Sequence, residues 1–361
     1  MTRADIIVSG PVPSPTIDLT PNKIEFGKIF VPAWLQSRYQ QGAWEPATIE
    51  PLTSLSMHPA AVVFHYGQAI FEGMKAYRWA DGSANLFRPY ENARRFARSA
   101  DRMAMPILPE EAFVEGIRAL VDVQREWIPE YPGSLYIRPT MIGTEAFIGV
   151  RAANEILFYV LTLPTGAYFS QTAASKGAGA VRVFVTTSVG RAAHGGTGNV
   201  KAAANYAVTL QAIAEAKNKG CGQVLFLDGC REGKIEEMGG MNIFFVKGKK
   251  LLTPSLGDTI LPGVTRSSLI QLAPRLGYSV EETEISLNEI AADIKAGKVT
   301  EAFACGTAAV VVGIDSFLMD SGEEVAVGLS GAGPVTAELY EELVGIQYGT
   351  KPDPFNWIVK I

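Results

Sequence analysis

Hydrophobic and polar residues follow two different periods along this chain, and the period changes from segment to segment. Apolar residues at helical spacing predict amphipathic helices near 92–103 and 110–127. Short apolar runs bounded by turn formers predict strands at 155–163, 181–187 and 223–228. We therefore expect helices and strands in both halves of the chain.

The second half adds a hairpin and two helix starts. Strands at 242–246 and 251–253 flank a Lys-Gly-Lys-Lys turn, which predicts a hairpin. One helix is expected to begin near Thr265 and another at Ser286, where Ser286 and Glu289 have capping-box spacing. The elements do not alternate regularly enough for a TIM barrel, so we expect two α+β lobes with a cleft between them.

The length of 361 residues predicts about two domains. We expect a small N-terminal α+β domain at 1–164 and a large C-terminal domain at 180–361. Between them, residues 165–179 are rich in Gly, Ala, Ser and Thr without periodicity, which predicts an interdomain loop.

Composition narrows the function classes. Hydrophobic residues make up 47% and charged residues 19% of the chain, as in an ordinary globular protein. The formal net charge is -5 and no basic tract is present, which argues against nucleic-acid binding. The longest apolar run, near 304–314, is shorter than the roughly 20 residues that span a membrane. A cytoplasmic protein is expected.

Metal and nucleotide signatures are missing from the sequence. Cys221, Cys230 and Cys305 form no Cys-x-x-Cys pair, and the three histidines have no His-x-x-x-His spacing. The chain also lacks a P-loop and a Gly-x-Gly-x-x-Gly motif. We therefore expect no disulfide framework, no metal site and no dinucleotide site.

Lys201 stands among small uncharged residues in the run 195–206 and leads into a helix expected to end at Gly220. Desolvation lowers the pKa of a lysine, and a neutral amine can form a Schiff base with an aldehyde. A solvated lysine at the start of a helix has the same local pattern. The segment alone leaves both interpretations open.

Two segments could bind an anion. Residues 261–267 place a Pro-Gly turn before a helix, where free N–H groups and the Thr265 hydroxyl favour a phosphate, although such turns are also common structural features. Residues 304–309 interrupt an apolar strand with Gly-Thr, which predicts either a bulge or a second set of N–H donors.

Charged groups elsewhere also have two interpretations. Arg95, Arg98 and Arg102 share one face of the first predicted helix; such a face is usually solvated, unless one arginine turns inward to a phosphate. Glu237 stands just before Gly239 and is either a turn residue or the partner of a heterocyclic nitrogen.

Taken together, these segments resemble one family. The chain is similar to the branched-chain aminotransferases, pyridoxal-phosphate (PLP) enzymes of fold type IV, over nearly its whole length. The resemblance implies a two-domain α+β fold with the cofactor in the interdomain cleft. The motifs that carry it are residues 71–76, 136–139, 198–201, 205–206, 237–242, 260–266 and 306–308.

The resemblance implies a role for each cofactor residue. Lys201 would hold PLP covalently and act as a general base. Glu237 would face the pyridine nitrogen and Tyr206 the phenolic oxygen of the cofactor. The phosphate would be bound by Arg95, the backbone N–H groups of Val264 and Thr265, and the Thr307 hydroxyl.

The implied reaction moves an amino group between leucine, isoleucine or valine and 2-oxoglutarate, giving a branched 2-oxo acid and glutamate. The substrate carboxylate would lie on the Thr307–Ala308 backbone near Tyr136 and Arg138. Phe26, Phe71 and Met241 would line an apolar pocket. Tyr66, Ile148 and Val150 would reach across to a partner chain, so a homodimer or a larger assembly is expected.

Other activities remain possible within this fold type. They are a D-amino-acid transaminase and an aminodeoxychorismate lyase, whose chains are characteristically shorter. A cofactor-binding protein without turnover would be expected to have lost Lys201 or Glu237, and this chain keeps both.

Overall fold

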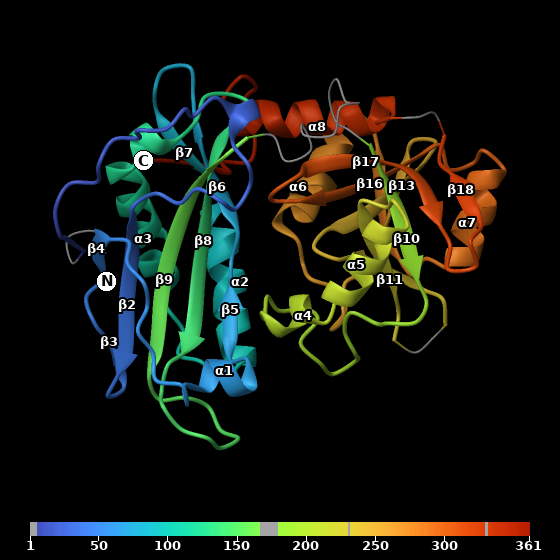
Figure 1. Ribbon diagram of the computed structural model, residues 1–361. Helices are drawn as coiled ribbons and strands as arrows, with labels where there is room; N and C mark the ends of the chain where they lie inside the picture. The colour runs from blue at the N-terminus through green and yellow to red at the C-terminus, as the bar shows by residue number, and fades with distance from the viewer. Residues whose placement is uncertain (1–5, 167–179, 230–231, 329–330) are drawn as a thin grey trace. The chain divides into compact units, whose positions relative to one another are not determined.

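The computed structural model describes residues 6–166, 180–229, 232–328 and 331–361 (Figure 1). Its contacts divide the chain into two units. Unit 1 is drawn from Met1–Tyr168, Val200–Ala204 and Ile346–Ile361, and unit 2 from Phe169–Asn199 and Asn205–Gly345. Each unit contains one sheet with helices, which confirms the α+β prediction.

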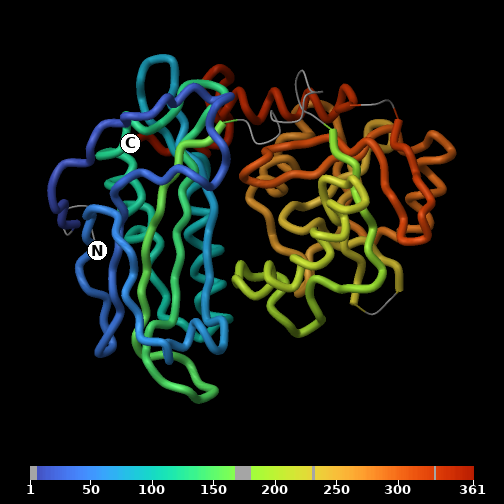
Figure 2. Tube along the Cα trace, viewed as in Figure 1, coloured from blue at the N-terminus to red at the C-terminus, as the bar shows by residue number. Residues whose placement is uncertain are grey.

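The predicted domain boundaries stay a prediction, and most of the predicted loop at 165–179 lies outside the described residues. Two later segments belong to unit 1. Lys201, which the sequence places in the second domain, lies in one of them. The other is the C-terminal end of the chain: Figure 2 shows it, in red, returning to the unit that holds the N-terminus.

The sheet of unit 1 contains ten strands within the described ranges, in the order β1-β4-β2-β9-β8-β6-β7-β19, with β3 on β2 and β5 on β8. All pairs are antiparallel except β1 with β4. The strand β9 confirms the one predicted at 155–163. The strands are β1 (Ile7–Val8), β2 (Ala33–Gln40), β3 (Ala43–Trp44), β4 (Thr48–Pro51), β5 (Ala69–Phe71), β6 (Met74–Arg78), β7 (Ala84–Phe87), β8 (Ser134–Gly143), β9 (Ile156–Thr165) and β19 (Ile358–Lys360).

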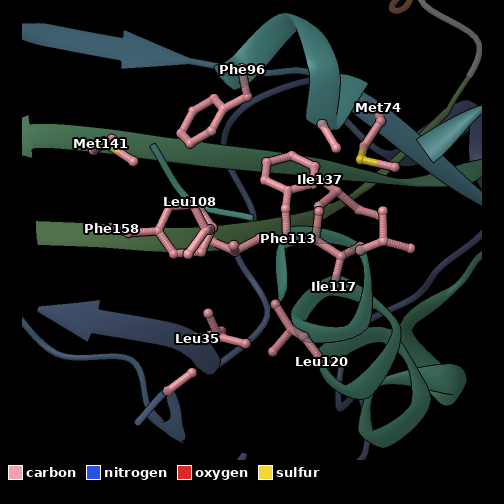
Figure 3. Packing of buried hydrophobic residues seen from close by; sticks show 14 of the residues in the cluster. Leu35, Met74, Phe96, Leu108, Phe113, Ile117, Leu120, Ile137, Met141 and Phe158 are labelled. Carbon is pink, nitrogen blue, oxygen red and sulfur yellow. The ribbon is translucent and has the colours of Figure 1, made fainter. Parts of the chain in front are cut away.

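Two helices of unit 1 confirm the helical periodicity of its sequence. They are α2 (Pro89–Arg102) and α3 (Glu110–Val123), which is followed by a 3-10 turn, Arg125–Trp127. Proline at the start of α2 suits its first turn. Phe96 of α2 packs against Phe113 of α3 and Phe158 of β9, with ring centroids 5.2 and 5.7 Å apart (Figure 3). This buried cluster holds α2 against the sheet. The unit also contains α1 (Val62–Tyr66) and the 3-10 turn Pro21–Lys23.

The sheet of unit 2 contains nine strands in the part of the chain that the structure describes, in the order β12-β11-β10-β17-β16-β13-β14-β15, with β18 on β17. β10 pairs in parallel with β11 and β17 and confirms the strand predicted at 181–187, while β13 and β14 form the predicted hairpin. The strands are β10 (Ala180–Thr186), β11 (Gln223–Leu227), β12 (Ile235–Met238), β13 (Asn242–Lys247), β14 (Lys250–Pro254), β15 (Ser279–Thr283), β16 (Glu301–Gly306), β17 (Val310–Leu318) and β18 (Glu324–Ala326).

The predicted helix starts of this half are also confirmed. The helix α6 begins at Val264, and α7 is capped by Ser286, whose side chain accepts a hydrogen bond from Glu289 N. The helices are α4 (Ala204–Ala207), α5 (Leu210–Asn218), α6 (Val264–Leu272), α7 (Leu287–Lys295), α8 (Pro334–Gln347) and the 3-10 turn Ala273–Leu276.

One helix prediction is wrong. The sequence predicts a single helix from the Lys201 segment to Gly220, but the structure contains α4 and α5, both after Lys201. The backbone around Lys201 pairs with β5 instead, and Thr209 closes a turn on the carbonyl of Tyr206 between the two helices. Gly220 does end α5, with φ of +71°.

A search of the described ranges finds no helix with the length and hydrophobicity to cross a membrane. The same part of the chain has no group of three or more His, Cys, Asp or Glu side chains arranged to bind a metal ion.

Candidate functional site

Lys201 is held against β5 by its own backbone. Its carbonyl accepts a hydrogen bond from Phe71 N at 3.1 Å, and Ala203 N donates to the carbonyl of Ala69 at 3.0 Å. Its amide donates to Ser99 Oγ at 3.0 Å, and Nζ lies 4.7 Å from the centre of the Phe71 ring. The half-buried lysine therefore has a fixed backbone and an aromatic neighbour.

One face of α2 turns polar groups inward. Asn92, Arg95 and Ser99 are buried there, while the neighbouring Arg94, Arg98 and Arg102 are exposed. The Ser99 hydroxyl donates to the carbonyl of Arg95 at 2.9 Å. Of the arginines that the sequence placed on one face of this helix, only Arg95 turns inward.

The partner of Arg95 is Glu72, which is fully buried. Nε and Nη2 of Arg95 donate to its two carboxylate oxygens at 2.6 and 2.9 Å, and Asn92 and Gly73 N donate at 2.7 and 3.0 Å. Burial alone would raise the pKa of Glu72, but the charge and hydrogen bonds of Arg95, together with the charge of Lys201 and the Asn92 hydrogen bond, outweigh burial and lower that pKa. Because a guanidinium has five donors, Arg95 can bind Glu72 and a phosphate together.

Aromatic rings gather on β5 and β8. The hydroxyl of Tyr136 accepts a hydrogen bond from Arg138 at 3.0 Å, and the Arg138 guanidinium lies 4.6 Å from the Phe71 ring. Phe26 meets Tyr136 edge to face at 5.2 Å. A Cβ at Gly73 would be within 2.2 Å of the Tyr136 hydroxyl, so only glycine fits there. The structure thus brings four of the predicted substrate residues together.

Glu237 is the centre of the candidate site in unit 2. It lies on β12, is 3% exposed, and forms an ion pair with the buried Arg191. Leu261 N donates to Oε1 at 3.0 Å, and Asn242 Nδ2 donates to Oε2 at 3.2 Å. These donors favour the charged carboxylate, which argues against the interpretation of Glu237 as a simple turn residue.

Tyr206 and Met241 lie near the loop that follows Glu237. A Cβ at Gly240 would be 3.9 Å from Cε1 of Tyr206, and one at Gly306 would be 3.1 Å from Cγ of Met241. The first distance is an ordinary van der Waals contact, whereas the second is tight, so Gly306 but not Gly240 makes room for its neighbour.

Two segments of unit 2 contain the other residues predicted to bind the phosphate. The helix α6 begins directly after Gly263 with no side-chain cap, so Val264 and Thr265 lie in its first turn. Thr307 and Ala308 form the turn between β16 and β17. Val310, which ends this turn, has φ of +62°, a strained conformation for a β-branched residue.

A family comparison matches residues 69–317 to the model described as amino-transferase class IV. This stretch is more than half of the chain and includes all the residues predicted to bind the cofactor. The chain belongs to the class IV aminotransferases.

Named members of this class match the chain almost end to end. A branched-chain-amino-acid aminotransferase from Mycolicibacterium smegmatis is 43% identical over 343 residues, which cover 93% of this chain and 92% of that protein. Branched-chain-amino-acid transaminase 1 of Bacillus subtilis is 41% identical and covers 94% of this chain and 95% of its own.

Solved structures agree. The branched-chain amino acid aminotransferase of Thermobaculum terrenum, in a PLP-bound form, superposes with a TM-score of 0.71 at 26% identity and covers 90% of this chain and 97% of its own. A branched-chain aminotransferase from Thermoproteus uzoniensis, with norvaline, has a TM-score of 0.72 at 26% identity and covers 90% and 98%.

Three predicted residues of this class IV aminotransferase lie on its surface. Tyr66, Ile148 and Val150 are 42, 72 and 93% exposed. Their predicted role across a subunit interface stays a prediction.

Sequence reasoning missed several buried polar residues of this aminotransferase. Arg191 stands among small residues, which is the signal that singled out Lys201, and Glu72 and Asn242 lie inside the matched motifs. Lys75 on β6 is 7% exposed, and burial lowers its pKa to about 8. Ser99 carries no sequence signal, because its contact partner is distant in the chain.

Proposed function

We propose that this class IV aminotransferase is a branched-chain-amino-acid transaminase that depends on PLP. The main support for this proposal is that more than 90% of the chain matches relatives of that name. The reaction exchanges the amino group between leucine, isoleucine or valine and 2-oxoglutarate.

The residues present fit PLP by their chemistry. The cofactor has an aldehyde, a phosphate and a pyridine nitrogen, and these need an amine, an anion site and a carboxylate. Lys201, Arg95 and Glu237 supply the three groups. Glycine at 263 lets Asn242 pack against the start of α6, because a Cβ there would lie 2.0 Å from Asn242 Oδ1.

Lys201 would bind the aldehyde carbon and, once displaced by the substrate amine, move the proton of the substrate α-carbon. The Ser99 and Phe71 hydrogen bonds fix its backbone, so only its side chain has to swing. PLP supplies the electron sink that takes up the electron pair left on that carbon.

The other proposed cofactor residues would bind PLP and fix its orientation. Glu237 would keep the pyridine nitrogen protonated, and the Tyr206 hydroxyl would donate to the phenolic oxygen. The phosphate would bind Arg95, the N–H groups of Val264 and Thr265, and the Thr307 hydroxyl.

The substrate would be recognised by charge at one end and by apolar contact at the other. Tyr136, Arg138 and the Thr307–Ala308 backbone would bind the carboxylate. Phe26, Phe71 and Met241 would surround the branched side chain. Differences of one methylene change such binding by only about 1–3 kcal/mol, so all three branched substrates should react.

We further propose a cytoplasmic homodimer in which Tyr66, Ile148 and Val150 complete the site of the partner subunit. The exposure of these apolar side chains in a single chain supports this proposal. Light scattering should give at least twice the monomer mass, and a monomer that is fully active would refute it.

The cofactor proposal is tested with purified protein and PLP. We expect a visible absorption band that the protein without PLP lacks. After borohydride reduction, mass spectrometry should show a pyridoxyl group added to the peptide that contains Lys201. The variant Lys201→Ala should lose both signals. A wild-type protein that shows neither would refute the proposal.

Substrate class is tested by single-turnover reactions with leucine, valine, glutamate and D-alanine. Leucine, valine and glutamate should each convert the bound cofactor to its amine form. If D-alanine reacts fastest, the protein is a D-amino-acid transaminase instead.

A further inference from the structure

Arg191 is a buried cation that none of the roles above uses. It is 6% exposed, lies before the loop that leads to Lys201, and is paired with Glu237. Its Nη2 also donates to the carbonyls of Gly198, at 3.0 Å, and Thr259. One guanidinium thus ties a strand residue to two loops.

The two loops carry predicted cofactor residues. Gly198 stands three residues before Lys201, and Thr259 stands two before Leu261, whose N–H also binds Glu237. The loops approach so closely that a Cβ at Gly198 would lie 2.5 Å from Cα of Thr259. Arg191 binds both loops and Glu237, so it can fix the position of the loops relative to the Glu237 carboxylate.

The buried charges of Glu237 and Arg191 stabilise each other. A buried carboxylate is stable in its charged form only with a close positive partner or several hydrogen bonds. Asn242 and Leu261 give neutral hydrogen bonds to Glu237, while Arg191 gives the positive charge. Glu237 can keep a pyridine nitrogen protonated only while it is itself charged and correctly oriented.

We propose that Arg191 is a positioning residue that keeps Glu237 charged and in a single orientation for the cofactor nitrogen. This inference rests on the proposed function, because it assumes that Glu237 faces PLP. Arg191 acts through Glu237 and does not touch the substrate.

The test compares Arg191→Gln and Arg191→Lys with the wild-type enzyme. Losing one charged hydrogen bond should weaken PLP binding roughly 10- to 100-fold. The pH midpoint of the bound-cofactor absorption should move upward, because a nearby positive charge is gone. In the reconstituted enzyme kcat should fall with little change in KM. Arg191→Lys keeps the charge but not the planar fork, so its effects should be smaller.

Arg182→Gln is the matched control. Arg182 lies in the same unit and pairs with the exposed Glu324, so it should change neither the affinity for PLP nor the pH midpoint. A second control is the pair of variants Glu237→Gln and Arg191→Gln/Glu237→Gln. If Arg191 acts through Glu237, the second substitution should weaken PLP binding less than twofold further.

Three outcomes would overturn the inference. Arg191→Gln could lower only the melting temperature, with the affinity for PLP and the pH midpoint unchanged, which would show a purely structural role. The effects of Arg191→Gln and Glu237→Gln on PLP binding could instead be additive, which would show that Arg191 does not act through Glu237. If wild-type protein fails to bind PLP at all, the proposed function fails first, and the inference with it.

Discussion

Among the described residues, each unit buries one arginine–glutamate pair, and the roles proposed for the two pairs are opposite. In unit 1, Arg95 is the proposed phosphate contact and Glu72 supports it with two hydrogen bonds. In unit 2, Glu237 is the proposed contact for the ring nitrogen and Arg191 supports it. Under this proposal, the same kind of ion pair would present a positive charge in one unit and a negative charge in the other.

The difference shows what a buried charge needs in order to act on a ligand. A lone ion is costly to bury, so the counter-ion stabilises the buried charge, while neutral donors fix the direction of the carboxylate. Glu72 has Asn92 and Gly73 N as extra partners, and Glu237 has Asn242 and Leu261 N. The ligand then meets a charge whose position is already set.

The largest effect is expected from Glu72→Gln, which removes the charge that faces Arg95. Leaving one ion of a buried pair without its partner costs roughly 3–5 kcal/mol of stability. Urea unfolding should show this loss. Glu91 forms an exposed pair with Arg94 on α2, the helix that carries Arg95, so Glu91→Gln should lose no more than about 1 kcal/mol. Equal losses for the two variants would contradict the importance of the buried pair.

Comparing ligands sharpens the contrast between the pairs. Glu72→Gln should weaken the binding of PLP but barely affect pyridoxal, which lacks the phosphate. Glu237→Gln should weaken both ligands to a similar extent, because both contain the ring nitrogen. The proposed directions of the two pairs would be wrong if Glu72→Gln weakened pyridoxal as much as PLP.

The next largest effect is expected at the glycines beside each pair. Gly73→Ala would push a Cβ into the Tyr136 hydroxyl, and Gly263→Ala would push one into Asn242 Oδ1. Overpacking of this kind costs roughly 1–3 kcal/mol. Thermal melting should reveal it in both variants, while Gly257→Ala, with nothing within 4 Å, should melt like wild type.

Much of this arrangement was predictable from local sequence. Periodicity gave α2, α3 and β9, and capping chemistry gave the start of α7, because these signals depend on neighbours in the chain. The small residues around Lys201 singled it out, but the segment alone left a solvated lysine as an equal alternative. The family resemblance then supplied the proposed roles of Arg95 and Glu237.

The rest depends on contacts between distant residues. The single helix predicted after Lys201 was wrong because its backbone pairs with β5, more than a hundred residues earlier. Glu72 and Arg191 are ordinary charged residues by composition, and only the fold shows that they are buried against Arg95 and Glu237. Periodicity says nothing of such partners.

A smaller effect is expected at Glu236, the neighbour of Glu237 on β12. It is 5% exposed, one carboxylate oxygen has no hydrogen-bond partner within the described residues, and burial raises its pKa. The folded protein therefore keeps an extra proton, and wild-type stability falls as the pH rises from the unfolded-state pKa through the folded-state value.

Glu236→Gln removes this loss. We expect the variant to gain about 1 kcal/mol at neutral pH and nothing at acidic pH, where Glu236 is protonated in both states. Urea unfolding at pH 4 and pH 8 would measure the difference, with the exposed Glu341→Gln as the control. A loss of stability at pH 8 would mean that Glu236, like Glu237, is stabilised in its charged form.

The smallest effect is expected for an exposed pair close to Arg191 in the chain. His194 Nδ1 lies 2.9 Å from Asp258 Oδ1, and this hydrogen bond raises the pKa of His194. Its contribution to stability is complete below the unfolded-state pKa and is lost as the pH rises through the folded-state value. Asp258→Asn should lower the pKa of His194 in an NMR titration, whereas Asp101→Asn should not. Because water and salt screen this pair, 1 M salt should remove most of the shift, yet leave the effect of Glu72→Gln on stability almost unchanged. Equal salt sensitivity would mean that burial does not set the strength of the two inner pairs.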